Sequence, residues 1–260
     1  MPRIAILQID VSDDENPQDR FERVINLLNA QKGKCDIAIL PELWMDGAFN
    51  IERSKKNAQS IMGEFVTSLS LAAKQAGIWL HAGSFSEKEA GKTFNTSLLI
   101  KSDGTVAHTY RKIHLFGFEG GEASEFASGT NVEVSNHGPL GNVGLSTCYD
   151  LRFPELFRAM LDKDVETFLV SSGWPEARLA HWQILLQARA IENQTWVVAC
   201  NEVGINGDVV FGGHSMVINP LGEIIFEAGN EQGVFYVDID LSLVAKTRKN
   251  FPVLEDRVLG

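Results

Sequence analysis

Short apolar runs alternate with amphipathic stretches along the first third of the chain. Residues 4–9 and 36–40 are apolar runs of strand length, and residues 19–30 between them carry hydrophobic side chains at helical spacing. A second helix is expected at residues 61–76 and a third strand at residues 78–83. Because a helix crossover returns the chain to the same end of a sheet, this order predicts parallel strands.

The rest of the chain adds hairpins to this pattern. A turn at residues 102–104 separates strand-like runs at 96–100 and 106–110, and a second hairpin is centred on Pro220. Further strands are expected at 143–145, 167–171, 195–200 and 233–238, and further helices beginning at Pro154 and covering 180–193 and 241–249. Hairpins argue against a purely parallel sheet. The pattern therefore predicts one α/β domain over residues 1–260, with two sheets face to face and helices outside.

Composition and charge exclude several classes of partner. The 260-residue chain has a formal net charge of -11, which disfavours nucleic acid and anionic membrane surfaces as partners. No apolar run approaches the roughly 20 residues that a membrane helix needs, and the N-terminus turns polar too soon for a signal peptide. The three cysteines, Cys35, Cys148 and Cys200, are too widely spaced for a disulfide framework or a zinc site. A reducing, cytoplasmic compartment is therefore expected.

Sequence motifs for cofactors are also missing. The sequence has no phosphate-binding loop, no dinucleotide motif after a strand and no metal-ligand spacing, so we expect no cofactor and no metal. Residues 115–131 show little periodicity and include three glutamates. A loop of this length within a compact domain is often functional.

Three chemically capable side chains follow apolar strands, where α/β folds place their ligand sites: Glu42, Lys112 and Cys148. Taken singly, each has an ordinary interpretation as a loop carboxylate, a solvated lysine or a buried structural cysteine. Cys148, however, lies between a strand and the helix that begins at Pro154. Backbone N–H groups at such a junction favour negative charge, which predicts a thiol that loses its proton readily.

A carboxylate, an ammonium group and a thiol together suffice to hydrolyse an amide. Attack of sulfur on the carbonyl creates an oxyanion that an ammonium group and a backbone N–H can stabilise, and losing one such donor costs about 3 kcal/mol. One carboxyl group can protonate the leaving amine and later deprotonate water. The chemistry needs no histidine, and His114 and His181 are interpreted as structural.

Three segments, in this order, resemble the signature segments of the nitrilase superfamily of carbon–nitrogen hydrolases. They are LPE at 40–42, YRKIHLF at 110–116 and CYDLRFPE at 148–155. The resemblance continues through GWP at 173–175, HW at 181–182, ARAIENQ at 188–194, GHS at 213–215 and NPLGE at 219–223, and so covers almost the whole chain. It implies a four-layer αββα sandwich and pairing of two copies into a homodimer.

The resemblance also implies catalytic roles. Glu42 would be the general base and acid, Lys112 the oxyanion-stabilising cation and Cys148 the nucleophile that forms a thioester, with the backbone N–H of Tyr149 as a second oxyanion donor. Many members carry another glutamate a few residues before a glycine in the loop between the lysine and cysteine segments. Glu122, ahead of Gly129, fits that position best, and its role would be to orient Lys112 and Glu42.

Glu119 and Glu125 are the other glutamates in that loop, and they remain alternatives to Glu122.

Within the superfamily, the chain most resembles the omega-amidase branch. Its members hydrolyse the terminal amide of short carboxylate-bearing monoamides such as 2-oxoglutaramate, giving the acid and ammonia. Holding the far carboxylate calls for an arginine, and Arg178 and Arg152 are equal candidates. Their ordinary interpretations are a solvent-facing loop charge and an ion pair with Glu155. Trp174 is a further candidate contact, or else a packing residue.

Three alternatives stay open from the sequence. An amidase for deaminated glutathione shares most of these segments, and a nitrilase uses the same three residues. A non-catalytic interaction protein on this fold would be expected to have lost one of Glu42, Lys112 or Cys148, and all three are present.

Overall fold

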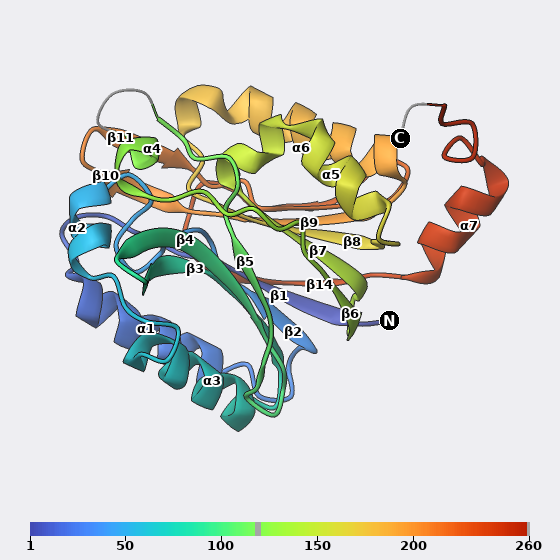
Figure 1. The fold of residues 1–260 in the computed structure, drawn as a ribbon. Helices are drawn as coiled ribbons and strands as arrows, with labels where there is room; N and C mark the ends of the chain where they lie inside the picture. Colours follow the sequence, from blue (N-terminus) through green and yellow to red (C-terminus); the bar gives the residue numbers. More distant parts are fainter. Residues whose placement is uncertain (118–120, 259–260) are drawn as a thin grey trace.

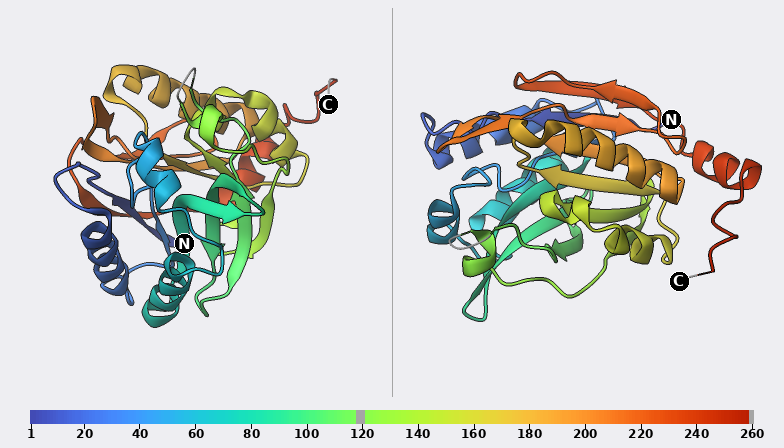
Figure 2. Two further views of the ribbon diagram at one scale, coloured as in Figure 1. Left: turned by 60° about the vertical axis from the view of Figure 1, so that its left-hand side comes forward. Right: turned by 90° about the horizontal axis from the view of Figure 1, so that it is seen from above.

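Two six-stranded sheets pack face to face between two layers of helices in the computed structural model of the protein, which describes residues 1–117 and 121–258. In Figure 1, α1 and α3 lie outside one sheet, and α5 and α6 lie outside the other. The predicted four-layer αββα sandwich is therefore confirmed. Figure 2 shows that α7 and the C-terminal segment extend away from the sandwich.

The first sheet combines parallel strands with hairpin strands. Its order is β14-β1-β2-β3-β4-β5, with β1, β2 and β3 parallel and the other pairings antiparallel. The strands are β1 (Arg3–Gln8), β2 (Ile37–Ile39), β3 (Trp79–Glu89), β4 (Lys92–Ile100), β5 (Val106–Arg111) and β14 (Gly233–Asp238).

The second sheet repeats this plan. Its order is β13-β12-β9-β8-β7-β6, with β7, β8 and β9 parallel. The strands are β6 (Val134–Gly138), β7 (Gly141–Thr147), β8 (Thr167–Ser172), β9 (Trp196–Asn201), β12 (Met216–Ile218) and β13 (Ile224–Glu227). A separate two-stranded ribbon contains β10 (Val203–Asn206) and β11 (Val209–Gly212).

The helices form where the sequence provides caps and one apolar face. In α1, the Asn16 side chain accepts a hydrogen bond from the Asp19 N–H at 3.0 Å, and Phe21, Val24 and Leu28 face the sheet. The α-helices are α1 (Pro17–Asn29), α2 (Ile51–Lys56), α3 (Glu64–Ala76), α4 (Glu122–Glu125), α5 (Pro154–Leu161), α6 (Leu179–Asn193) and α7 (Ser242–Asn250). Two 3-10 turns are η1 (Cys148–Arg152) and η2 (Glu176–Arg178). No helix in the described part of the chain is long and apolar enough to cross a membrane.

The core has two parts because successive strand residues point to opposite faces of a sheet. Along β1, Ala5 and Leu7 pack toward α1 and α3, whereas Ile4 and Ile6 pack between the two sheets. Both faces of the central strands are thus buried, as expected of parallel strands covered on each side.

The secondary structure confirms most predicted elements and adds several. Both hairpins, the helix from Pro154 and the strand at 233–238 are present. The sequence did not predict the continuation of β3 to Glu89, where it forms a hairpin with β4, nor the strands β6, β10 and β11. These segments are short or rich in Ser, Lys, Glu and Gly, so that they lack the apolar alternation that identifies a strand.

A bulge at Gly83 brings β3 against the loop that begins at Pro41. The pairing of β3 with β4 shifts register between His81 and Ser84, and Gly83 has φ +65°. A Cβ atom at Gly83 would lie only 1.9 Å from the Pro41 carbonyl oxygen. The bulge therefore lets the backbone N–H of Ser84 donate a hydrogen bond to the carbonyl oxygen of Pro41, the residue before Glu42, at 3.2 Å.

Gly83→Ala should destabilise the fold by about 3 kcal/mol or more, because it adds a backbone clash to the strain of positive φ. Gly77→Ala is the matched control, since Gly77 has φ +68° with nothing within 4 Å of its would-be Cβ, and it should cost about 1 kcal/mol. Urea unfolding measures both free energies. Equal losses in the two variants would show that the contact with Pro41 carries no cost.

Candidate active site

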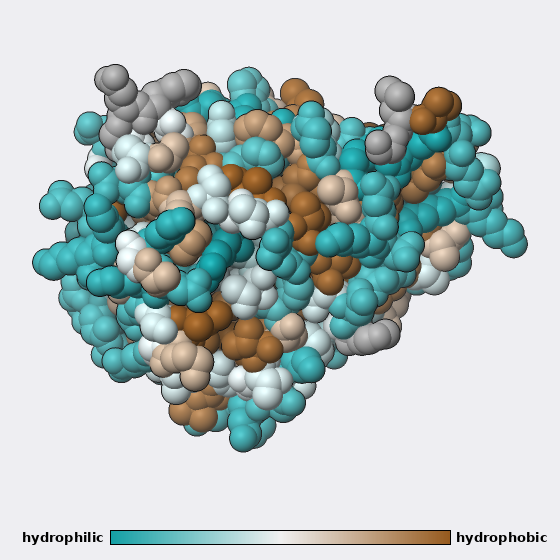
Figure 3. Space-filling view, in the orientation of Figure 1, coloured by the Kyte–Doolittle hydropathy of each residue, from teal (hydrophilic) through white to brown (hydrophobic). Residues whose placement is uncertain are grey.

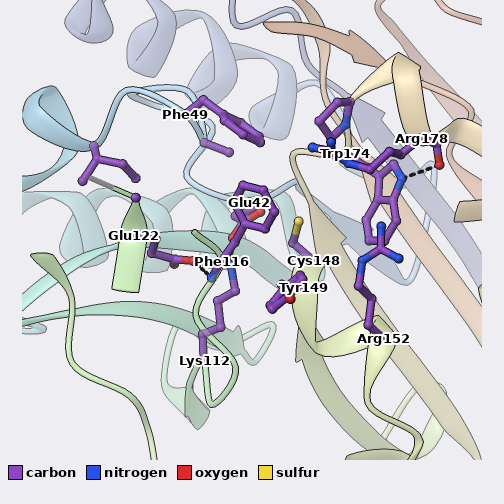
Figure 4. Close-up of a pocket in the computed structure, with 14 residues that line it drawn as sticks. Glu42, Phe49, Lys112, Phe116, Glu122, Cys148, Tyr149, Arg152, Trp174 and Arg178 are labelled. Atoms are coloured by element: carbon purple, nitrogen blue, oxygen red, sulfur yellow. Dashed lines mark hydrogen bonds and ion pairs between the residues drawn. The ribbon is translucent and has the colours of Figure 1, made fainter. Parts of the chain in front are cut away.

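The candidate site lies where several strands end at the same edge of the sandwich. Glu42 follows β2, Lys112 follows β5 and Cys148 follows β7. Figure 4 shows these three side chains and Glu122, from α4, directed toward one another in a pocket of about 160 Å³. The structure thus brings together residues that are more than 100 positions apart in the sequence.

Lys112 lies between two carboxylates. Its Nζ atom is 2.7 Å from Glu42 Oε1 and 2.7 Å from Glu122 Oε2. The Lys112 residue is 1% exposed, Glu42 2% and Glu122 4%. Buried charges of this kind are tolerated only when they are paired and hydrogen-bonded.

Further donors complete the hydrogen bonding of both carboxylates. The Asn95 amide donates to Glu42 Oε1 and to Glu122 Oε1, each at 2.8 Å. The backbone N–H of Gly173 donates to Glu42 Oε2 at 3.0 Å, and that of Phe116 donates to Glu122 Oε2 at 2.9 Å. Each carboxylate oxygen therefore has at least one donor, which fixes both side chains.

Cys148 is the first residue of η1, directly after β7, and its backbone is strained. Its φ is +46°, a region that residues with a side chain seldom adopt. Asp150 holds this turn, since Oδ2 accepts from the Thr147 N–H at 3.0 Å and from the Tyr110 hydroxyl at 2.6 Å. Asp150 Oδ1 accepts from the His114 N–H at 3.0 Å. Asp150 thereby ties the cysteine turn to the end of β5, and the His114 ring lies on the same carboxylate, with Nδ1 2.8 Å from Asp150 Oδ1.

The electrostatics overturn one prediction about the thiol. Burial raises the pKa of Cys148 well above its usual value, and the Glu42 carboxylate raises it further, against the opposing effect of Lys112. The position after β7 therefore does not promote thiolate formation as expected, because loss of water and the nearby carboxylate outweigh the backbone N–H groups. The α-helix also begins only at Pro154, after the 3-10 turn η1.

Lys112 remains an ammonium ion in this environment. Burial alone would lower its pKa, but Glu122 and Glu42 together raise the pKa well above the usual lysine value. Burial raises the pKa of Glu122, with Lys112 opposing the shift.

Two arginines flank the pocket, and both were candidate substrate contacts. The Arg152 guanidinium lies 4.7 Å from the centre of the Trp174 ring and the Arg178 guanidinium 5.6 Å from that of Phe116. Tyr149, Trp174 and both arginines line the pocket. Within residues 1–117 and 121–258, neither arginine forms an ion pair, so Arg152 does not make the alternative ion pair with Glu155.

Of the alternative loop glutamates, one lies on the surface and one cannot be placed. Glu125 is exposed and pairs with Lys55. Glu119 lies outside the described residues. Of the two loop glutamates that the structure describes, Glu122 contacts Lys112 and Glu125 does not.

Sequence reasoning missed three residues that hold this site: Asn95, Asp150 as an anchor of the turn, and Gly173. The only sequence feature that could have indicated Asn95 is its position as a polar residue shortly before the apolar run 98–100. Gly173 lies in the GWP segment at 173–175, which resembles the family, but that segment does not reveal the role of its N–H, which reaches Glu42 across 131 positions. No group of three or more His, Cys, Asp or Glu side chains in the described chain is arranged to hold a metal ion.

Comparison with known proteins agrees with this geometry. The family model described as carbon–nitrogen hydrolase matches residues 3–249. A 2-oxoglutaramate amidase of Paenarthrobacter nicotinovorans is 40% identical over 98% of this chain and 88% of that protein. A deaminated glutathione amidase of Dictyostelium discoideum is 34% identical over 100% of this chain and 95% of that protein.

A solved structure agrees as well. The CN-hydrolase superfamily protein XC1258 from Xanthomonas campestris, which carries an arsenic adduct in its active site, superposes with a TM-score of 0.90 at 30% identity. The match covers 100% of this chain and 99% of that one. With the family model matched from end to end and the sandwich shared, this chain belongs to the carbon–nitrogen hydrolase family.

Proposed function

We propose that the protein hydrolyses the terminal amide of a small carboxylate-bearing molecule, with Cys148 as nucleophile. The observation that carries this proposal is the Lys112 ammonium group held 2.7 Å from both Glu42 and Glu122 beside the Cys148 thiol. A fixed cation next to a nucleophile is the arrangement that stabilises an oxyanion. Tyr149, the residue after Cys148, supplies a second donor through its backbone N–H.

The proton transfers follow from the charge of each group. Glu42 is the carboxylate whose charge acts on the thiol, so the thiol proton passes to Glu42 as sulfur bonds to the amide carbon. Collapse of the oxyanion breaks the C–N bond, and Glu42 returns the proton to the departing ammonia. Water then attacks the thioester while Glu42 takes its proton, and that proton returns to sulfur as the acid leaves.

Glu122 keeps the cation in place and does not carry protons. Its Oε2 atom accepts from both Lys112 and the Phe116 N–H, and its Oε1 atom accepts from Asn95. We therefore assign Glu122 to orienting Lys112.

The substrate class rests on the two flanking arginines and on the named relatives. Arg178 and Arg152 line the pocket without a carboxylate partner in the described chain, and an arginine holds a carboxylate through two parallel hydrogen bonds. The similarity to a 2-oxoglutaramate amidase favours a monoamide of that kind as substrate. An amidase for deaminated glutathione is the second candidate, favoured by the similarity to the Dictyostelium enzyme.

Assembly and location belong to the same proposal. We assign residues 1–260 to one domain acting as a homodimer in the cytoplasm. Ile184 and Ile191 are exposed on α6, and Leu221 lies exposed beside Gly222, which packs against Ile191. Apolar surface of this kind favours pairing of two copies. Hydrophobic side chains also gather in patches on the otherwise largely hydrophilic face in Figure 3.

All three cysteines are free thiols, which fits a reducing compartment.

Ammonia release from a substrate panel tests the proposal directly. The enzyme should turn over 2-oxoglutaramate fastest among 2-oxoglutaramate, succinamate, deaminated glutathione and a nitrile. Cys148→Ala should lower the rate by at least about 10³-fold, because it removes the nucleophile. Turnover of none of the amides, or full activity in Cys148→Ala, would disprove the assignment.

Arg178→Ala should raise KM for 2-oxoglutaramate roughly 10- to 100-fold, the effect expected from losing a charged hydrogen bond. It should leave KM for a neutral amide of the same length nearly unchanged. Arg152→Ala serves as the comparison, and steady-state kinetics with both substrates measures the effect. If Arg178→Ala affects both substrates equally, Arg178 does not contact the carboxylate.

The free enzyme should hold Cys148 as a thiol, because its pKa is raised well above the usual value. The difference in ultraviolet thiolate absorbance between wild type and Cys148→Ala should therefore stay close to zero from about pH 6 to about pH 8. Cys35, whose burial raises its pKa to about 11, contributes equally to both proteins. A difference signal that is present at pH 6, or that appears within this range, would instead indicate a thiolate.

A further inference from the structure

One buried carboxyl group close to the site has no role in the proposed chemistry. Glu202 follows β9, is 0% exposed and does not line the pocket. Its Oε1 atom has no hydrogen-bond partner among residues 1–117 and 121–258, and Glu202 forms no ion pair with any of them. A fully buried acid without a charged partner is costly, and its position therefore calls for an explanation.

The Glu202 carboxyl group lies between two segments that build the site. Its Oε2 atom accepts from the Ala48 N–H at 3.4 Å, and Ala48 lines the pocket. Gly173 also lies close to this carboxyl group. A Cβ atom added to Gly173 would lie 2.5 Å from Glu202 Oε2 and 2.3 Å from Ala48 Cβ, so there is room only for glycine. Glu202 thus contacts the residue whose N–H holds Glu42 at 3.0 Å and also one wall of the pocket.

No ionisable group among residues 1–117 and 121–258 forms an ion pair with Glu202. The charge of Glu42 raises the pKa of Glu202, while Arg20 of α1 and Arg53 of α2 lower it, and Glu202 in turn raises the pKa of the buried Arg20. Arg20 pairs with Glu15 at 3.1 Å, and Arg53 pairs with Asp13 at 3.0 Å.

Burial, followed by the charge of Glu42, raises the pKa of Glu202 well above its usual value, and the arginines do not reverse this shift. Full burial without an ion pair therefore favours the protonated, neutral form of this carboxyl group.

We propose that Glu202 acts as a neutral carboxylic acid that positions Glu42, by packing Ala48 and Gly173 against each other. A neutral group can fill this space beside Glu42 without repelling it. An ionised Glu202 would place a third carboxylate charge near Lys112 and would shift Gly173 and its hydrogen bond to Glu42. The catalytic part of this inference rests on the proposed function, whereas the charge state of Glu202 does not.

Thermal unfolding of Glu202→Gln tests the charge state without any substrate. Folding keeps Glu202 protonated, while the unfolded chain releases this proton above its ordinary pKa, so the wild type loses stability as pH rises. The glutamine side chain of the variant keeps an uncharged hydrogen-bond acceptor and does not ionise, so its stability has no pH dependence from this position. Its Tm relative to wild type should therefore increase by about 5–10 °C from about pH 5 to about pH 8.

Glu87→Gln is the matched control. Glu87 is 1% exposed but pairs with Arg111 at 2.7 Å, and its pKa is lowered because the bonds from Arg111 and Thr96 outweigh burial. A lowered pKa contributes stability that is complete above the ordinary carboxyl pKa, so the Tm of Glu87→Gln should lie below that of wild type by a nearly constant amount from about pH 5 to about pH 8. If Glu202→Gln behaves in the same way as Glu87→Gln, Glu202 is ionised and the inference is wrong.

Activity tests the positioning role. Glu202→Gln should keep kcat/KM within about threefold of wild type near neutral pH, and Glu202→Ala should lose about 10- to 100-fold, since small displacements at a reacting centre cost this much. The ratio of the Gln variant to wild type should rise toward alkaline pH, where Glu202 ionises. Equal losses in the Gln and Ala variants, or a ratio that does not change with pH, would overturn the inference.

The two proposals fail in different ways. If no amide is hydrolysed, the proposed function fails while the Tm comparison still decides the charge of Glu202. If Cys148→Ala abolishes turnover but the Tm of Glu202→Gln does not increase relative to wild type toward alkaline pH, the proposed function stands and this inference alone is wrong.

Discussion

The site depends on one buried ion cluster, in which the Lys112 ammonium group bridges Glu42 and Glu122. Removing three charges from water is expensive, and the cluster is stable only because each charge meets an opposite one and every carboxylate oxygen has a donor. Its members come from the end of β2, the end of β5 and the short helix α4, with Asn95 of β4 beneath them. Folding of the sandwich and assembly of the site are therefore the same event.

Close backbone approaches keep this cluster beside the Cys148 thiol. Gly83 lets β3 contact the carbonyl before Glu42, and Gly173 lets its N–H reach the Glu42 carboxylate. Cys148 adopts positive φ, and Asp150 holds that strained turn against the end of β5. Strain of this kind persists only where surrounding contacts determine the backbone, and here those contacts come from both sheets.

Burial also decides which groups carry charge. The same loss of water that raises the pKa of Cys148 and of Glu202 strengthens the pairing of Lys112 with its carboxylates. The resting site thus concentrates its charge on the lysine and its partners, and the thiol stays neutral until a substrate accepts its electrons. A base close to the sulfur is then required, and Glu42 is the group whose charge reaches it.

The sequence by itself determined the layers of the fold and the three side chains at strand ends, because strand and helix periodicity and strand-end positions are local properties. It identified Glu42, Lys112 and Cys148 as candidates through their segments, and the resemblance to the nitrilase superfamily favoured Glu122 while leaving Glu119 and Glu125 as alternatives. Tertiary structure alone decided the charge of the thiol and the roles of Asn95, Gly173 and Glu202. Desolvation and contacts between residues up to 154 positions apart, as between Ala48 and Glu202, leave no periodic trace in a sequence.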